Sequence, residues 1–206
     1  MTNPRAEWVN TTHDWAGAVD QDHLEQIRSD PARYAPGGLI HLVLEVIAYP
    51  EDEAESASRR GTCTVTLHTD GSIAIEDNGR GTDTRVDEHG QLIKKPIMAT
   101  QDLRFFANPE SPLLPGTNPR RGMSVVAALS DWLVHTNRRL NGSWTQRYEL
   151  GLPVTDLDPI PTTPTTGTTV HFHPNAAYFP GKNLTADDLH PFLTFPHLDI
   201  RIITGS

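Results

Sequence analysis

Residues 73–81 limit the possible folds of this chain more than any other segment. They form a short alternating strand that runs into an acidic residue and a glycine-rich turn (Ile-Ala-Ile-Glu-Asp-Asn-Gly-Arg-Gly). Ile73 and Ile75 share one face of such a strand, because side chains alternate with a period of two. The chain leaves the sheet at Gly79, since glycine adopts backbone conformations that are costly for other residues. The carboxylate of Asp77 is therefore placed where it could accept hydrogen bonds on the floor of a pocket.

The neighbouring sequence predicts an antiparallel hairpin. Residues 63–68 alternate as a strand, Asp70-Gly71 is a hairpin turn signal, and residues 72–76 return antiparallel to the first strand. Polar or proline-rich loops are expected at 82–95, 108–121 and 153–166. Further strands are expected at about 133–138, 144–150, 167–172 and 198–203.

The strongest predicted helix spans residues 38–48. Its apolar residues recur at the i, i+3, i+4, i+7, i+8 spacing of one helix face, and Glu45 lies off the centre of that stripe. Pro50 lacks an amide donor and is expected to kink or end this helix, although residues 51–55 could resume it. Other helices are expected at 22–29, 97–107, 122–133 and 184–193.

Helices mixed with mostly antiparallel hairpins predict an α+β fold. We expect a two-layer sandwich, in which a mixed, mostly antiparallel sheet is covered by helices on one face, rather than a doubly wound parallel sheet. The 206-residue length suits one domain. Residues 1–20 are expected to form an N-terminal arm, and residues 21–206 a single domain.

Composition excludes several functional classes. The formal net charge of -9 argues against broad phosphate-backbone binding, so direct DNA binding is not expected. A single cysteine, Cys63, excludes an intrachain disulfide framework and a multi-cysteine zinc site, and no metal site is predicted. No apolar run approaches 18 residues and no signal pattern opens the chain, which indicates a cytoplasmic protein with no membrane contact.

Several short motifs also occur in a fixed order along the chain. With these motifs, the chain resembles the N-terminal ATPase domain of the DNA gyrase B subunit, a member of the GHKL superfamily with the Bergerat-type sandwich. The resemblance runs from about residue 27 to the C-terminus. The matching segments are 38–46 (Gly-Leu-Ile-His-Leu-Val-Leu-Glu-Val), 70–73 (Asp-Gly-Ser-Ile), 76–81, 124–130 (Ser-Val-Val-Ala-Ala-Leu-Ser), 148–153 (Tyr-Glu-Leu-Gly-Leu-Pro) and 166–170 (Thr-Gly-Thr-Thr-Val).

The resemblance implies roles for individual residues. Asp77 matches the aspartate that reads the adenine amino group, and Thr168 matches the threonine that holds a shared water. Glu45 matches the glutamate that polarises the attacking water as general base. The remaining matches are Gly79 and Gly81 in the turn beside the nucleotide, Arg80 with Glu53 as a pair closing one rim, Gly122 in the phosphate-capping stretch, and either Arg138 or Arg139 at the pocket mouth.

The sequence departs from the family on the phosphate side. Tyr49 stands where the family has a magnesium-binding asparagine, and tyrosine is a poor Mg²⁺ ligand. In the phosphate-capping stretch only Gly122 remains of the later glycines, and Pro119 has no amide to donate. The side chains of Arg120 and Arg121 could bind phosphates instead. These departures argue against Mg²⁺ binding by the family's ligands and against efficient hydrolysis.

Two functions follow from this pattern. The first is an adenine-nucleotide-binding domain that binds ATP or ADP with weak or absent hydrolysis and is not a topoisomerase on its own. The alternative is a non-enzymatic pseudo-ATPase, a binding module for a gyrase-like protein partner or for a small molecule in the adenine pocket. Asp77 taken alone would also suit a turn-capping role. The sequence leaves open whether the chain is an enzyme.

Overall fold

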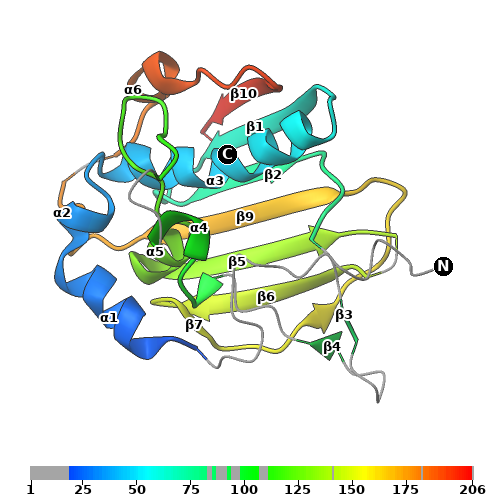
Figure 1. The fold of residues 1–206 in the computed structure, drawn as a ribbon, viewed down its shortest axis with the longest axis horizontal. Helices are drawn as coiled ribbons and strands as arrows, with labels where there is room; N and C mark the ends of the chain where they lie inside the picture. The colour runs from blue at the N-terminus through cyan, green and yellow to red at the C-terminus, as the bar shows by residue number, and fades with distance from the viewer. Residues whose placement is uncertain are drawn as a thin grey trace.

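The computed structural model describes residues 19–82, 85–86, 92–93, 98–106, 111–140, 142–181 and 183–205. Residues 1–18 of the predicted arm lie outside these ranges. The described chain forms two layers, with the helices on one face of a single large sheet (Figure 1). The predicted α+β sandwich is therefore confirmed. None of the helices formed by these residues is both long and apolar enough to cross a membrane.

The sheet has eight strands, and most of its pairs are antiparallel. The strand order is β10-β1-β2-β9-β5-β6-β7. The eighth strand, β8, is not part of this order and pairs with β6. Only the β1–β10 pair among them is parallel, whereas β3 and β4 form a separate two-stranded hairpin. The strands are β1 Gly61–Leu67, β2 Ile73–Asp77, β3 Arg85–Val86, β4 Leu92–Ile93, β5 Ser130–Arg138, β6 Trp144–Glu149, β7 Leu152–Pro153, β8 Asp158–Pro159, β9 Gly167–Pro174 and β10 Leu198–Thr204.

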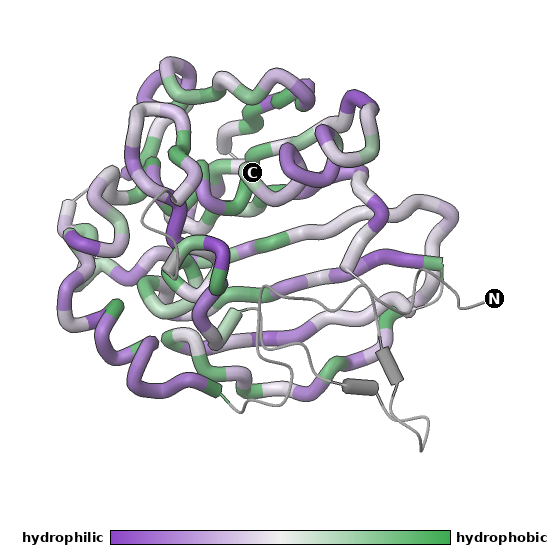
Figure 2. Tube along the Cα trace, in the orientation of Figure 1, coloured by the Kyte–Doolittle hydropathy of each residue, from purple (hydrophilic) through white to green (hydrophobic). Residues whose placement is uncertain are grey.

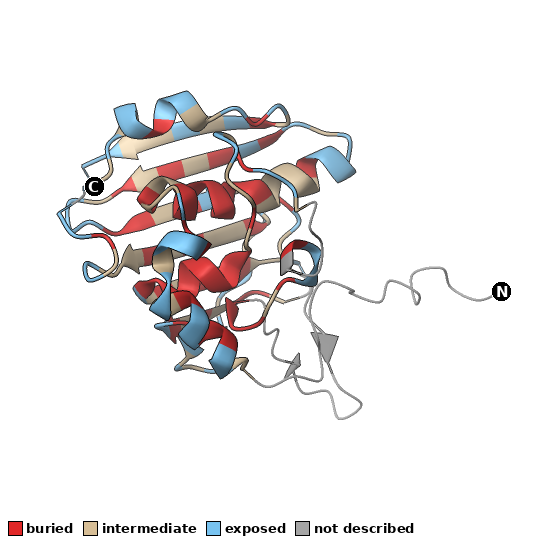
Figure 3. Ribbon diagram, turned by 60° about the vertical axis from the view of Figure 1, so that its left-hand side comes forward, coloured by how far each residue is buried: buried red, intermediate tan, exposed pale blue. Residues whose placement is uncertain are grey.

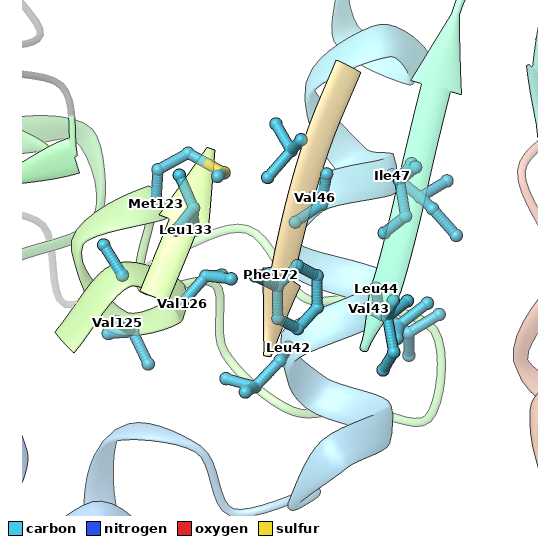
Figure 4. Packing of buried hydrophobic residues seen from close by; sticks show 14 of the residues in the cluster. Leu42, Val43, Leu44, Val46, Ile47, Met123, Val125, Val126, Leu133 and Phe172 are labelled. Carbon is cyan, nitrogen blue, oxygen red and sulfur yellow. The ribbon is translucent and has the colours of Figure 1, made fainter. Parts of the chain in front are cut away.

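The hydrophobic core lies between the sheet and the helices, and both contribute side chains to it. Leu42 on α3 and Val126 on α5 are fully buried, and the Phe172 ring of β9 lies among the side chains of these two helices (Figure 4). Each such side chain contributes about 1.5–3 kcal/mol through burial. Figure 3 shows the buried positions where α3 and α5 meet the central strands, and Figure 2 shows hydrophilic residues on outer elements such as α1. The helices are α1 Gln21–Ser29, α2 Pro31–Tyr34, α3 Leu39–Ser56, α4 Leu103–Phe106, α5 Met123–Ala128, α6 Ala186–Leu189 and the 3-10 turn η3 His190–Phe192.

Helix α3 does not end at Pro50. It continues for six residues beyond the proline, as the alternative of a resumed helix allowed. A proline removes a single intrahelical hydrogen bond, and tertiary contacts offset that loss here. Ala54 is buried in the core, and Glu53 accepts hydrogen bonds from the glycine turn, so the second half of the helix is held at two points.

Three other predicted helices are wrong in extent. The helix predicted at 122–133 ends at Ala128, because Ser130 begins β5, which pairs with β9 along its whole length. Of the helix predicted at 97–107, the described residues 98–106 contain only the short α-helix α4. The Asp102 carboxylate accepts the Arg104 N–H at the start of α4. The helix predicted at 184–193 is the short α6 followed by η3. The short β3–β4 hairpin lies in the predicted loop 82–95.

Candidate functional site

Asp77 lies at the end of β2, in the middle of the sheet. The strand register places it opposite Cys63 of β1, and its Oδ1 accepts the Gly79 N–H at 2.7 Å. Burial raises the pKa of Asp77 to about 6, and the Glu53 carboxylate adds to the rise, whereas the N–H groups of Gly79 and Thr168 oppose it. At neutral pH this group is a partly buried carboxylate, ready to accept a hydrogen bond.

The turn after Asp77 is crowded at its two glycines. A Cβ atom at Gly79 would lie 2.6 Å from Glu53 Oε2 and 2.7 Å from Asp77 Oδ1. Gly81 has a φ of +76°, and a Cβ atom there would lie 2.7 Å from the Arg138 carbonyl oxygen. Gly81 is therefore required both for its backbone conformation and for the close approach of the β5 backbone, whereas a side chain at Gly79 would have to displace the Glu53 and Asp77 carboxylates.

The chain at the start of β9 packs against the same turn. The Thr166 hydroxyl donates to the Gly79 carbonyl oxygen at 2.7 Å, and a Cβ atom at Gly167 would overlap the Asp77 carbonyl group. The next residue, Thr168, donates its N–H to the Asp77 carboxylate. The fold thus brings together Asp77, Gly79 and Thr168, although β2 and β9 are far apart in the sequence.

Arg80 and Glu53, the two residues of the predicted rim pair, contact each other. The Arg80 N–H and Nε both donate to Glu53 Oε1, at 2.7 and 3.2 Å. Of the two candidate arginines in the β5–β6 hairpin, Arg139 contacts the glycine turn, with Nη1 donating to the Gly81 carbonyl oxygen at 3.1 Å. Arg138 instead donates to the Thr169 hydroxyl on β9.

Glu45 is fully buried, although the sequence placed it beside the apolar stripe. Its Oε2 accepts the Arg121 N–H at 2.9 Å, and its Oε1 accepts the Gly122 N–H at 2.8 Å. Arg120 Nε lies 3.6 Å from Oε1, and His41 Nε2 lies 3.5 Å from Oε2. Burial raises the pKa of Glu45 against the opposing effects of the Arg120 charge and the two N–H donors. Burial, and then the Arg121 charge, lower the pKa of His41 to about 4, so this imidazole is neutral near pH 7.

Tyr49 lies one turn further along α3. Its hydroxyl donates to Asp102 Oδ2 at 3.2 Å and accepts the Met123 N–H at 3.3 Å. Burial, followed by the charges of nearby carboxylates, raises the pKa of Tyr49, so the phenol stays neutral. The guanidinium groups of Arg120 and Arg104 lie over its ring, 5.0 and 5.5 Å from the centroid.

A network of ion pairs surrounds this tyrosine. Arg120 Nη1 donates to Asp52 Oδ2 at 2.7 Å, and Arg104 Nη2 donates to Asp102 Oδ2 at 2.6 Å. Both guanidinium groups also lie over the Phe105 ring, at 4.5 and 4.7 Å. Sequence reasoning missed Asp102, Arg104 and Phe105, because no motif marks them. Their contacts with Tyr49, Asp52 and Arg120 also join segments that are distant in the sequence. Over the described ranges, no group of three or more His, Cys, Asp and Glu side chains is arranged to hold a metal ion.

Comparison with known proteins gives sequence relatives. No protein-family model matches the chain. The chain is 36% identical over 174 residues to the DNA gyrase B subunit of Thermotoga maritima, and 34% identical over 161 residues to the DNA topoisomerase 4 B subunit of Bacillus subtilis. The matches cover 81% and 76% of this chain, but only 27% and 24% of those proteins. The chain therefore spans about a quarter of the length of the curated relatives that it matches.

Solved structures resemble the fold over most of its length. The topoisomerase IV ATP-binding domain of Francisella tularensis, in complex with a small-molecule inhibitor, matches with a TM-score of 0.69 and 25% identity, covering 88% of this chain and 90% of that one. The 43K ATPase domain of Thermus thermophilus gyrase B, in complex with an aminocoumarin, matches with a TM-score of 0.63 and 29% identity, covering 81% and 43%.

Proposed function

We propose that this chain is an adenine-nucleotide-binding domain that binds ATP or ADP and hydrolyses ATP weakly or not at all. The proposal draws on its similarity to the ATPase domains of the DNA gyrase and topoisomerase IV B subunits. We assign this function to residues 21–206 as a single domain, and no topoisomerase activity to these residues alone. The observation that carries the proposal is the convergence of Asp77, Gly79 and Thr168 at the ends of β2 and β9.

The chemistry of this corner suits an adenine base. The Asp77 carboxylate, ionised above about pH 6, is an acceptor for the exocyclic amino group of adenine. Gly79 and Gly81 have no side chains, so a ligand can approach the backbone beside that carboxylate. Thr168 provides a hydroxyl from the neighbouring strand. A few convergent polar groups of this kind fix the orientation of a ligand in a site.

The contacts of Glu45 support weak hydrolysis. A general base must take a proton from the attacking water, and both Glu45 oxygens already accept backbone N–H groups while Arg120 lies beside them. The fit to Mg²⁺ is also poor, because this ion prefers carboxylate and amide oxygens, whereas Tyr49 offers a phenol that is already bound to Asp102. We therefore assign no catalytic step to a metal in this chain.

Calorimetric titration tests nucleotide binding. We expect heat on addition of ADP or a non-hydrolysable ATP analogue to the native chain, and loss of that heat in Asp77→Asn. Asp70→Asn is the matched control, because Asp70 lies in the turn at the other end of the same hairpin and accepts hydrogen bonds from Ser72. Absence of heat with every adenine nucleotide would overturn the proposed function.

A phosphate-release assay tests the second half of the proposal. We expect release close to the rate without protein, both with and without Mg²⁺. Robust Mg²⁺-dependent turnover that disappears in Glu45→Ala would show that the general base is active and would contradict weak hydrolysis.

One observation favours the second candidate, a pseudo-ATPase that binds a small molecule or a gyrase-like protein partner. The ion-pair network around Tyr49 fills the phosphate side of the site with the chain's own groups. The similar Francisella and Thermus domains were solved with an inhibitor and an aminocoumarin. Tight aminocoumarin binding with no response to any adenine nucleotide would select this candidate.

A further inference from the structure

Three consecutive backbone N–H groups donate to side chains of α3. The Arg121 and Gly122 N–H groups donate to Glu45, and the Met123 N–H donates to the Tyr49 hydroxyl. Successive N–H groups that point the same way are the donors with which proteins commonly bind phosphate oxygens. Here all three are satisfied by oxygen atoms of the chain itself, two from a carboxylate and one from a phenol.

Two cationic side chains near these N–H groups, those of Arg120 and Arg104, are also paired internally. Arg120 is 4% exposed, with Nη1 bound to Asp52 and Nε 3.6 Å from Glu45. Arg104 makes its shortest contact with Asp102 and also lies 3.6 Å from Asp52. A phosphate that recruited Arg120 would leave the buried Glu45 carboxylate without its cation, which is strongly unfavourable.

We infer that this chain holds its adenine ligand through the base alone, as a nucleoside or as a nucleotide whose phosphates and Mg²⁺ add no affinity, because Glu45 and Tyr49 occupy the donors that phosphate oxygens would use. This inference rests on the proposed function, since it specifies the ligand of the same site. It goes further by separating the two ends of that site: the Asp77 carboxylate is only partly buried, whereas the donors at residues 121–123 are already satisfied by side chains of the protein.

Calorimetric titrations of the native chain with adenosine, AMP, ADP and ATP test this inference directly. We expect dissociation constants that agree within about threefold across the series, and the same values in Mg²⁺ and in EDTA. ATP binding at least tenfold tighter than adenosine binding, or ATP binding that is lost in EDTA, would overturn the inference and leave the proposed function standing. If no adenine-bearing compound binds, the proposed function and this inference both fail.

Substitution of the two α3 residues gives a gain-of-function test. Glu45→Ala frees two N–H donors and one side of Arg120, so ADP should bind at least about tenfold more tightly than adenosine in this variant, as expected for charge-assisted hydrogen bonds. Tyr49→Phe frees only the Met123 N–H and should give a smaller gain in the same direction. Unchanged ratios in both folded variants would contradict the inference.

The matched control for Glu45→Ala is Glu51→Ala. Glu51 lies on the same helix and accepts the N–H of His197, away from residues 121–123. We expect this variant to keep the near-equal affinities of the native chain. Circular dichroism melts confirm folding of each variant, and the native titration decides the question if Glu45→Ala does not fold.

Discussion

The ionisation of Asp77 should destabilise the folded chain, and Asp77→Asn should remove this effect. Burial is the main cause of its raised pKa, so the folded chain holds the proton more tightly than the unfolded chain does. Well below pH 3.8, the ordinary pKa of the group, both states are protonated and the group has little effect on stability. As pH rises toward 6, the unfolded chain loses its proton first, and the free energy of unfolding falls.

The size of this effect follows from the two pKa values. The difference between about 6 in the folded chain and the ordinary 3.8 corresponds to about 3 kcal/mol at 1.36 kcal/mol per unit. About 2 kcal/mol of this total falls between pH 4 and pH 8, because the unfolded group is already half ionised near pH 4. An asparagine oxygen accepts the same N–H groups from Gly79 and Thr168 without carrying a charge.

Urea denaturation of the native chain and of Asp77→Asn, followed at several pH values from 4 to 8, measures the effect. The free energy of unfolding of the variant, relative to that of the native chain, should rise by about 2 kcal/mol from pH 4 to pH 8. Asp70→Asn is a control of opposite sign, because hydrogen bonds from Ser72 lower the pKa of Asp70, and its charge stabilises the fold above the unfolded pKa. A stability difference between Asp77→Asn and the native chain that does not change with pH would refute the reasoning.

Three further substitutions or reactions test the packing around the site. Arg120→Met leaves the Glu45 carboxylate buried without its cation, so urea denaturation should show a loss of about 3–5 kcal/mol, and a loss below about 1 kcal/mol would contradict the role of this pair. Gly81→Ala combines a positive φ with a clash against the β5 backbone, so it should destabilise the chain by more than Gly181→Ala, where φ is +68° and nothing lies within 4 Å; equal losses in thermal melts would argue against the clash. Burial raises the pKa of Cys63 to about 12, so a thiol reagent should label it slowly in the native chain and rapidly in urea, and rapid native labelling would show that β1 opens readily.

Local sequence patterns predicted the elements that position Asp77 and the glycine turn. The alternation of residues 73–77 and the glycines after them place Asp77 at a strand end, and Gly81 indeed has a positive φ that favours glycine. The order of helices and hairpins predicted the sandwich, because such patterns reflect which face of each element is buried. The match to Glu53 and Arg80 likewise predicted a contact that the structure contains.

Local patterns could not predict contacts between distant segments. Tyr49 and Asp102 are 53 positions apart, and Asp52 and Arg120 are 68 apart, so neither pair leaves a periodic signal. The burial of Glu45 depends on Arg121 and Gly122, which reach it only in the folded chain. The helix predicted beyond Ala128 failed for a related reason, because pairing with β9 overrides helix propensity from Ser130 onward.

A crystal structure of this chain grown with ADP and Mg²⁺ tests the central claim most directly. The account predicts density for the adenine ring with its amino group at the Asp77 carboxylate, while Glu45 still accepts the N–H groups of Arg121 and Gly122. The phosphates should then make no contact with those N–H groups, and no Mg²⁺ should be bound by α3. Density for phosphates on the N–H groups of residues 121–123, with Glu45 displaced, would contradict the account.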